Sequence, residues 1–146
     1  MGTKEHKKHA FKSVKIGIIT LSTTRTLADD ESGLWIKKQV WENGHDVVFH
    51  QVIPDNAKVI TNTVADVLRD SEPHALLLTG GTGVSPGDVT IEAVRPLFEK
   101  ELTAFGALFA QLSYEEIGSA AVLSRAAAGV IGNTAVFCMP GSLKGC

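Results

Sequence analysis

Residues 78–90 read LTGGTGVSPGDVT, and they connect an apolar run at residues 75–79 to a segment that begins near Thr90 with helical character. Five of the eight residues from 80 to 87 are glycine or proline. That density is costly at the end of a buried strand unless the backbone must turn tightly or let a ligand come close. Free N–H groups in such a turn form a concave anion site, and the start of the next helix adds its positive end. The stretch therefore predicts a phosphate-binding loop, with a plain strand-to-helix turn as the alternative.

Apolar runs and helical segments alternate on both sides of this loop. Short runs rich in apolar and β-branched residues predict strands, and they cover residues 14–21, 45–53, 75–79, 120–123 and 134–139. Helical spacing, with Asp29 or Asp30 as the first N-cap, predicts helices over residues 30–43, 60–68, 90–96 and 105–112. This order is typical of parallel βαβ units and predicts a three-layer α/β/α sandwich with a mostly parallel sheet. The loops after residues 21, 53, 79 and 139 should then converge at the edge where such folds bind ligands.

Composition and charge narrow the class of protein. The chain has 146 residues, of which 44% are hydrophobic, so one domain with a substantial core is expected. Its 14 basic residues against 16 acidic ones give a net charge of -2, which offers no electrostatic basis for binding nucleic acid. Cys138 and Cys146 are too few for a disulfide scaffold, and no apolar run approaches the roughly 18 residues of a membrane span. We expect a soluble protein of the cytoplasm that binds neither nucleic acid nor membrane.

The first 12 residues differ from the rest of the chain. They contain four lysines against one glutamate, and they have no apolar segment like that of a signal peptide. We expect residues 1–12 to form a basic, flexible tail and residues 13–146 to form a single folded domain.

Two aspartates follow predicted strands at the ligand-binding edge. Asp55 comes just after the strand at residues 45–53, and Asp88 lies in the glycine-rich loop. Two carboxylates beside a bound phosphate would repel it unless a cation lay between them, so the pair predicts Mg²⁺ together with a nucleotide. Taken singly, an Asx turn would account for Asp55, and an N-cap position near Thr90 would account for Asp88.

Five motifs, in this order along the chain, resemble the MoaB/MogA family of molybdenum cofactor biosynthesis proteins. The most specific is TGGTG at residues 79–83, which is followed by DVT at residues 88–90. The other four are DESG at residues 30–33, IPD at 53–55, LSR at 123–125 and PGS at 140–142. The likeness covers nearly the whole chain after the tail.

The resemblance implies a three-layer α/β fold, a homotrimer or hexamer, and a site for molybdopterin and a nucleotide. Enzymes of the family transfer AMP from Mg-ATP, the co-substrate, to the terminal phosphate of molybdopterin and release pyrophosphate. By position, Asp55 and Asp88 match the two aspartates needed for activity, and they are the expected Mg²⁺ ligands. The expected phosphate-binding residues are Thr79, Gly80, Gly81, Thr82 and Gly83. The expected molybdopterin-binding residues are Ser22, Asp30, Ser32, Gly33, Ser124, Arg125, Pro140, Gly141, Ser142 and Lys144.

Two departures from the family pattern support an alternative function. Gly87 stands where the family usually carries an arginine before the aspartate, and the chain ends at Cys146, where the family continues into a C-terminal helix. Without that helix, an apolar stripe on the sheet would be exposed. The alternative is a non-catalytic molybdopterin-binding or oligomeric assembly protein of the same family.

Other conspicuous side chains are expected to be structural. Cys138 lies in an apolar run, where a free cysteine acts as a small hydrophobic residue. His50 has no metal-ligand partners nearby in the sequence, so a packed or hydrogen-bonded histidine is expected. Trp35 and Trp41 are expected in the core or at a subunit interface.

Overall fold

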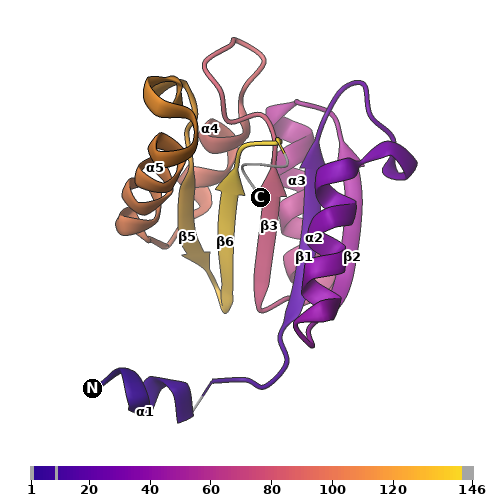
Figure 1. Ribbon diagram of the computed structural model, residues 1–146. Coiled ribbons are helices and arrows are strands. Elements are labelled where there is room, and N and C mark those ends of the chain that lie inside the picture. The colour runs from indigo at the N-terminus through magenta and orange to yellow at the C-terminus, as the bar shows by residue number, and fades with distance from the viewer. Residues whose placement is uncertain (1, 9, 143–146) are drawn as a thin grey trace.

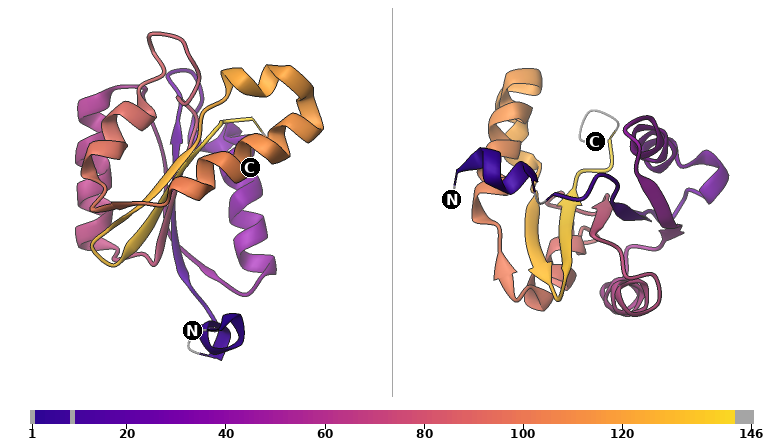
Figure 2. Two further views of the ribbon diagram at one scale, coloured as in Figure 1. Left: turned by 90° about the vertical axis from the view of Figure 1, so that its left-hand side faces the viewer. Right: turned by 90° about the horizontal axis from the view of Figure 1, so that it is seen from below.

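The computed structural model describes residues 2–8 and 10–142, whose helices and strands form three layers (Figure 1). In chain order the elements are α1 (Thr3–Lys8), β1 (Lys15–Leu21), α2 (Glu31–Glu42), β2 (Asp46–Ile53), α3 (Ala57–Asp70), β3 (Ala75–Thr79), α4 (Thr90–Val94), β4 (Lys100–Glu101), α5 (Thr103–Ile117), β5 (Ala127–Ile131) and β6 (Thr134–Met139). Three short 3₁₀ helices join them: η1 (Leu27–Asp29), η2 (Arg95–Leu97) and η3 (Gly118–Leu123). Helices α2 and α5 lie on one face of the sheet, and α3 and α4 lie on the other (Figure 2).

The sheet has the strand order β2-β1-β3-β6-β5-β4. Strands β2, β1, β3 and β6 pair in parallel, whereas β5 is antiparallel to β6, and β4 is antiparallel to β5. The predicted three-layer sandwich with a mostly parallel sheet is therefore confirmed. Among the described residues, no helix combines the length and the apolar character needed to cross a membrane.

The core is fully closed between the sheet and helices α3 and α4. Leu76 and Leu78 of β3 and Cys138 of β6 are 0% exposed, and they belong to one apolar cluster with Ile60 and Val64 of α3. Burial raises the pKa of the Cys138 thiol to about 12, so this cysteine is an inert core side chain, as predicted.

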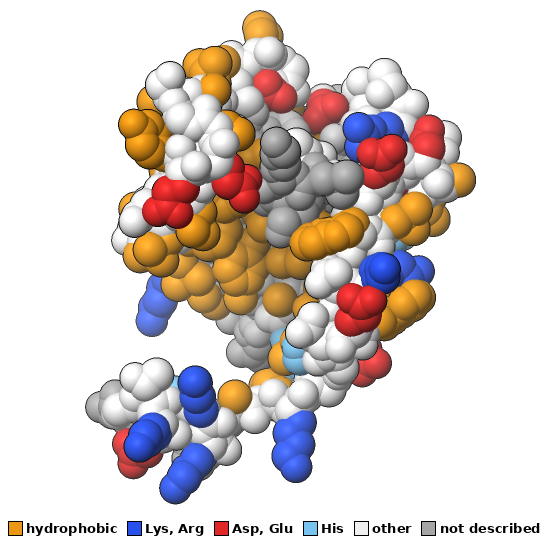
Figure 3. Space-filling model, in the orientation of Figure 1, with side chains coloured by type: hydrophobic (Ala, Val, Ile, Leu, Met, Phe, Trp, Pro, Cys, Tyr) orange, Lys and Arg blue, Asp and Glu red, His pale blue; other side chains and the backbone are white. Residues whose placement is uncertain are grey.

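Residues 2–8 and 10–142 cover the opposite face of the sheet less completely. Leu77, Phe137 and Met139 alternate with the buried residues along β3 and β6 and are only half-buried. Together with Trp35 and Val40 of α2 they line an apolar groove of ≈ 430 Å³. Apolar side chains gather between α2 and α5 in Figure 3. The exposed apolar stripe that was expected from the end of the sequence stays a prediction.

One predicted strand is wrong and one strand was not predicted in the segment that follows α5. Residues 120–123 belong to η3, not to a strand, and Val122 and Leu123 are exposed. The place beside β6 is taken by β5, which the sequence analysis missed because Ala and Gly residues carry little strand preference. Packing requires glycine at position 129, because a Cβ there would collide with the ring of Phe98.

The tryptophans and the tail differ from expectation in smaller ways. Trp35 and Trp41 are 41% and 60% exposed, so neither is a core residue, and the interface alternative remains a prediction. Helix α1 was not predicted; it contains no buried residue and projects away from the body of the protein (Figure 1). The flexibility of the tail stays a prediction.

Candidate functional site

Four loops meet at the carboxyl ends of the parallel strands, as the sequence predicted. The Ser22 amide donates to the Ile53 carbonyl at 2.9 Å, which joins the ends of β1 and β2. The Gly80 amide donates to the Met139 carbonyl at 2.9 Å, which joins the ends of β3 and β6. The predicted nucleotide and molybdopterin segments therefore begin side by side on one sheet edge.

The glycine-rich loop holds a conformation that other residues would not adopt. Gly80 and Gly81 have φ values of 100° and 65°, in the left-handed region that favours glycine. A Cβ at Gly81 would also collide with the Thr90 hydroxyl and approach Asp55 Oδ1 to 2.9 Å. Thr90 fixes the turn, because its hydroxyl donates to the Gly80 carbonyl at 2.8 Å and its amide donates to the Gly81 carbonyl at 3.0 Å. Positive φ angles account for both glycines, and at Gly81 the close approach of Asp55 excludes a side chain as well.

Asp55 lies against this loop with an unsatisfied carboxylate oxygen. Its Oδ1 is buried and has no hydrogen-bond partner among the residues that the structure describes. Burial, and then the negative charge of Asp88, raise the pKa of the Asp55 carboxyl above its usual value. An Asx turn does not account for Asp55 Oδ1, which accepts no hydrogen bond from a described residue, and the N-cap of α3 is Asn56, whose side chain accepts from the Val59 amide.

Asp88 faces the inside of its own loop. Its Oδ2 accepts from the Ser85 amide at 3.0 Å, and a Cβ at Gly83 would lie 2.7 Å from the same oxygen. The N-cap alternative is wrong, since Val89 is the N-cap of α4 and makes no side-chain cap. Neither aspartate caps the helix that follows it, but Asp88 makes a local contact with Ser85 in its own turn, whereas Asp55 Oδ1 has no such partner in the part of the chain that the structure describes.

The carboxylate pair fits a magnesium ion. Asp55 Oδ1 is buried without a hydrogen-bond partner among residues 2–8 and 10–142, and the nearby Asp88 carboxylate raises the pKa of the Asp55 carboxyl. A hard cation bound between the two carboxylates would stabilise their ionised forms. Among the described residues, no group of three or more His, Cys, Asp or Glu side chains could hold a metal alone. Mg²⁺ bound here would take its other ligands from water or from substrate phosphates, as Mg²⁺ in proteins usually does.

Arg125 braces the glycine-rich loop in this structure. Its Nε donates to the carbonyls of Thr82 and Gly83, each at 3.0 Å. Its two terminal nitrogens hold the Glu92 carboxylate at 2.7 and 3.1 Å, and this contact lowers the pKa of Glu92 and raises that of Arg125. The contact of Arg125 with molybdopterin stays a prediction, since its guanidinium is already engaged by the loop.

Three predicted molybdopterin residues share a small cavity with the face of α5. The cavity of ≈ 90 Å³ is lined by Ser124, Pro140 and Ser142, and on α5 by Phe109, Ser113, Glu116 and Ile117. The α5 residues were not predicted from the sequence, although their spacing places them on one helical face. Ser22 lies apart from this cavity, and its Oγ accepts from the Arg25 amide at 3.1 Å. Lys144 lies outside the described residues.

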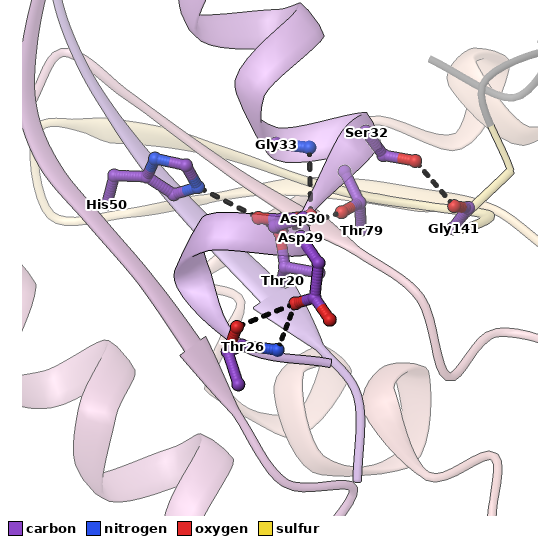
Figure 4. A network of polar contacts seen from close by, with 9 residues as sticks. All are labelled: Thr20, Thr26, Asp29, Asp30, Ser32, Gly33, His50, Thr79 and Gly141. Atoms are coloured by element: carbon purple, nitrogen blue, oxygen red, sulfur yellow. Dashed lines mark hydrogen bonds and ion pairs between the residues drawn. The ribbon is translucent and has the colours of Figure 1, made fainter. Parts of the chain in front are cut away.

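The remaining predicted residues belong to a buried polar network at the start of α2 (Figure 4). Asp30 is the N-cap of α2, as predicted, and accepts from the Gly33 amide. It is 0% exposed, so direct contact with a ligand stays a prediction. A packed or hydrogen-bonded histidine was predicted at position 50, and His50 does pair with Asp30.

Fold and site together define an α/β protein with a glycine-rich loop and an acidic pair at the carboxyl edge of its sheet. The family model described as "Probable molybdopterin binding domain" matches residues 17–146, and the chain belongs to this family. The predicted resemblance to the MoaB/MogA family is thereby confirmed.

Individual relatives agree with this assignment. The chain is 46% identical over 143 residues to "Molybdenum cofactor biosynthesis protein B" of Bacillus subtilis, covering 97% of this chain and 84% of the relative. It is 39% identical over 150 residues to "Molybdopterin adenylyltransferase" of Pyrococcus furiosus, covering 99% and 87%. A crystal structure of a molybdenum cofactor biosynthesis protein B superposes with a TM-score of 0.88 at 43% identity, covering 92% of this chain and 84% of that one.

Proposed function

We propose that the protein acts in molybdenum cofactor biosynthesis as a Mg-ATP-dependent molybdopterin adenylyltransferase of the cytoplasm. The observation that carries the proposal is the buried, unpartnered Asp55 oxygen beside Asp88 and the glycine-rich loop. The name of the Pyrococcus furiosus relative supports the same reaction. The substrates would be molybdopterin and ATP.

The reaction needs positioning more than acid-base chemistry. An oxygen of the terminal phosphate of molybdopterin forms a bond to the α-phosphorus of ATP, the bond from that phosphorus to the β-phosphate oxygen breaks, and pyrophosphate leaves. The attacking phosphate is already anionic at neutral pH, so no protein nucleophile or strong base is required. Bound Mg²⁺ would neutralise the charge of the ATP phosphates. Asp55 and Asp88 would hold that ion, and the loop at residues 80–83 would align the phosphates by its backbone.

One observation favours the binding or assembly alternative. Gly87 is exposed, and a Cβ there would meet nothing within 4 Å. An arginine would therefore fit at this position, and its absence removes a cation from the rim of the phosphate loop. A protein of this kind would bind molybdopterin without turnover.

Pyrophosphate release separates the two functions. We expect purified protein with Mg-ATP to release pyrophosphate only when molybdopterin is added, with adenylyl-molybdopterin formed in equal amount. Reactions without molybdopterin or without Mg²⁺ are the controls. Saturable binding of molybdopterin with no pyrophosphate above those controls would contradict the enzyme and favour the binding protein.

We also propose a homo-oligomer, a trimer or hexamer, formed through α5 and η3. Helix α5 has 15 residues and none of them is buried. Leu108, Leu112 and Val122 are 61%, 64% and 83% exposed. Large exposed apolar patches of this kind mark interaction surfaces, and the cavity that α5 shares with Ser124 would then lie near a subunit boundary.

Charge placed in this surface should dissociate the oligomer. We expect Leu112→Glu to reduce the mass measured by size exclusion with light scattering to that of a monomer, because association would bury the new carboxylate without a partner. Trp41→Glu is the matched control, since Trp41 is 60% exposed on α2. Dissociation by Trp41→Glu alone would place the interface on α2 instead, and a monomeric wild-type protein would contradict the oligomer.

A further inference from the structure

A buried carboxylate joins three elements of the sheet edge at the start of α2 (Figure 4). Oδ2 of Asp30 accepts from the Thr20 hydroxyl at 2.6 Å and pairs with His50 Nε2 at 2.9 Å. Its Oδ1 accepts from the Gly33 amide at 3.0 Å. The side chains of Asp30 and His50 are 0% and 6% exposed. A buried charge of this kind requires all its donors, so the network fixes the first turn of α2 against β1 and β2.

The network reaches the pterin side of the site through one strong contact. The Ser32 hydroxyl, two residues after Asp30, donates to the Gly141 carbonyl at 2.7 Å. Gly141 in turn lies against the phosphate loop, because a Cβ there would stand 3.0 Å from the Gly80 Cα. The position of α2 therefore sets how closely the PGS turn, residues 140–142, approaches the glycine-rich loop.

The contact with the phosphate side is weaker. Thr20 accepts from the Thr79 hydroxyl at 3.5 Å, at the outer limit of a hydrogen bond. Gly33 completes the packing, since a Cβ there would collide with the Asp30 carboxylate and the His50 ring. The distances favour control of the pterin turn over control of the nucleotide loop.

We infer that His50 and Asp30 are positioning residues, which act through Ser32 to hold the PGS turn at the distance from the phosphate loop that the molybdopterin phosphate needs. The inference rests on the proposed function of this edge. Neither residue touches a reacting atom. His50 supplies the donor that keeps the buried Asp30 carboxylate, and with it the first turn of α2, in place.

The inference predicts that variants of this network change KM for molybdopterin much more than KM for ATP. We expect His50→Leu and Ser32→Ala each to raise KM for molybdopterin about tenfold, with KM for ATP changed less than about twofold. His50→Gln, which retains an N–H donor, should recover most of the loss. Val40→Ala is the matched control, because Val40 is a buried α2 residue outside the network; it should lower thermal stability without the split. Equal effects on both substrates, or the same split in Val40→Ala, would overturn the inference.

A second readout does not depend on the reaction. Amide hydrogen exchange of the ligand-free protein should show faster exchange at residues 134–142 in His50→Leu and Ser32→Ala than in wild type or Val40→Ala. Unchanged exchange would overturn the inference even in an active enzyme. Wild-type protein that binds no molybdopterin would refute the proposed function, whereas the exchange comparison would still decide the positioning role. If His50→Leu does not fold, Ser32→Ala carries both measurements.

Discussion

Asp55→Asn is expected to raise the thermal stability of the ligand-free protein at neutral pH while lowering molybdopterin-dependent turnover by at least about 10²-fold. The two effects have one cause. Asp55 is partly buried near Asp88, and both the burial and the Asp88 charge raise the pKa of its carboxyl, so ionisation of Asp55 opposes folding. Asparagine has a similar shape and carries no charge, but it supplies a much weaker ligand for Mg²⁺.

The pH dependence has a defined sign. Because the Asp55 pKa is higher in the folded state than in the unfolded chain, the folded state binds the proton more tightly. The resulting stability is fully present below the ordinary value of 3.8 and is lost as pH rises through the raised pKa. The stability advantage of Asp55→Asn should therefore be small at pH 3.8 and below and largest at neutral pH.

Thermal unfolding with and without Mg²⁺ measures both parts of this prediction. Mg²⁺ should stabilise the wild-type protein, which binds it in the folded state, and should have little effect on Asp55→Asn. Asp66→Asn is the control, since Asp66 is an exposed partner of Arg69 on α3; it should keep the wild-type response to Mg²⁺. An Asp55→Asn protein that is less stable than wild type at neutral pH and still gains stability from Mg²⁺ would refute the assignment.

The position of the acidic pair was predictable from sequence, whereas its environment was not. Asp55 and Asp88 each follow a parallel strand, and such strands place their carboxyl ends on one edge. That the Asp55 oxygen is buried and unpartnered depends on how the turn at Gly81, which Thr90 holds through the Gly80 carbonyl, lies against it. Side-chain packing of this kind has no signature in residue spacing.

The same limit applies to the rest of the fold and site. Strands β1, β2, β3 and β6 were found because β-branched and apolar runs mark buried parallel strands. Strand β5 was missed because it contains Gly129, which has little strand preference. Glycine is needed there because a Cβ would collide with the ring of Phe98. His50 pairs with Asp30, which lies 20 positions away in the sequence, and Arg125 pairs with Glu92, which lies 33 positions away. Only the three-dimensional arrangement brings these side chains together.

The second large effect is expected at Arg125. We expect Arg125→Ala to lower kcat/KM for Mg-ATP by about 10²-fold, because the loop carbonyls of Thr82 and Gly83 lose their shared donor and the phosphate cradle shifts. Arg125→Lys should not restore activity. A lysine ammonium cannot hold Glu92 through two parallel bonds while a third nitrogen holds the loop.

Glu92→Gln separates this bracing role from direct binding of molybdopterin. If Arg125 braces the loop, Glu92→Gln weakens its anchor and raises KM for ATP in the same direction as Arg125→Ala, with KM for molybdopterin nearly unchanged. If Arg125 instead binds the molybdopterin phosphate, loss of the Glu92 charge frees the guanidinium, so KM for molybdopterin should fall, and Arg125→Ala should raise it. Steady-state kinetics with each substrate varied in turn distinguish the two. Because the geometry already commits four contacts of Arg125 to the loop and to Glu92, the first outcome is the one we expect.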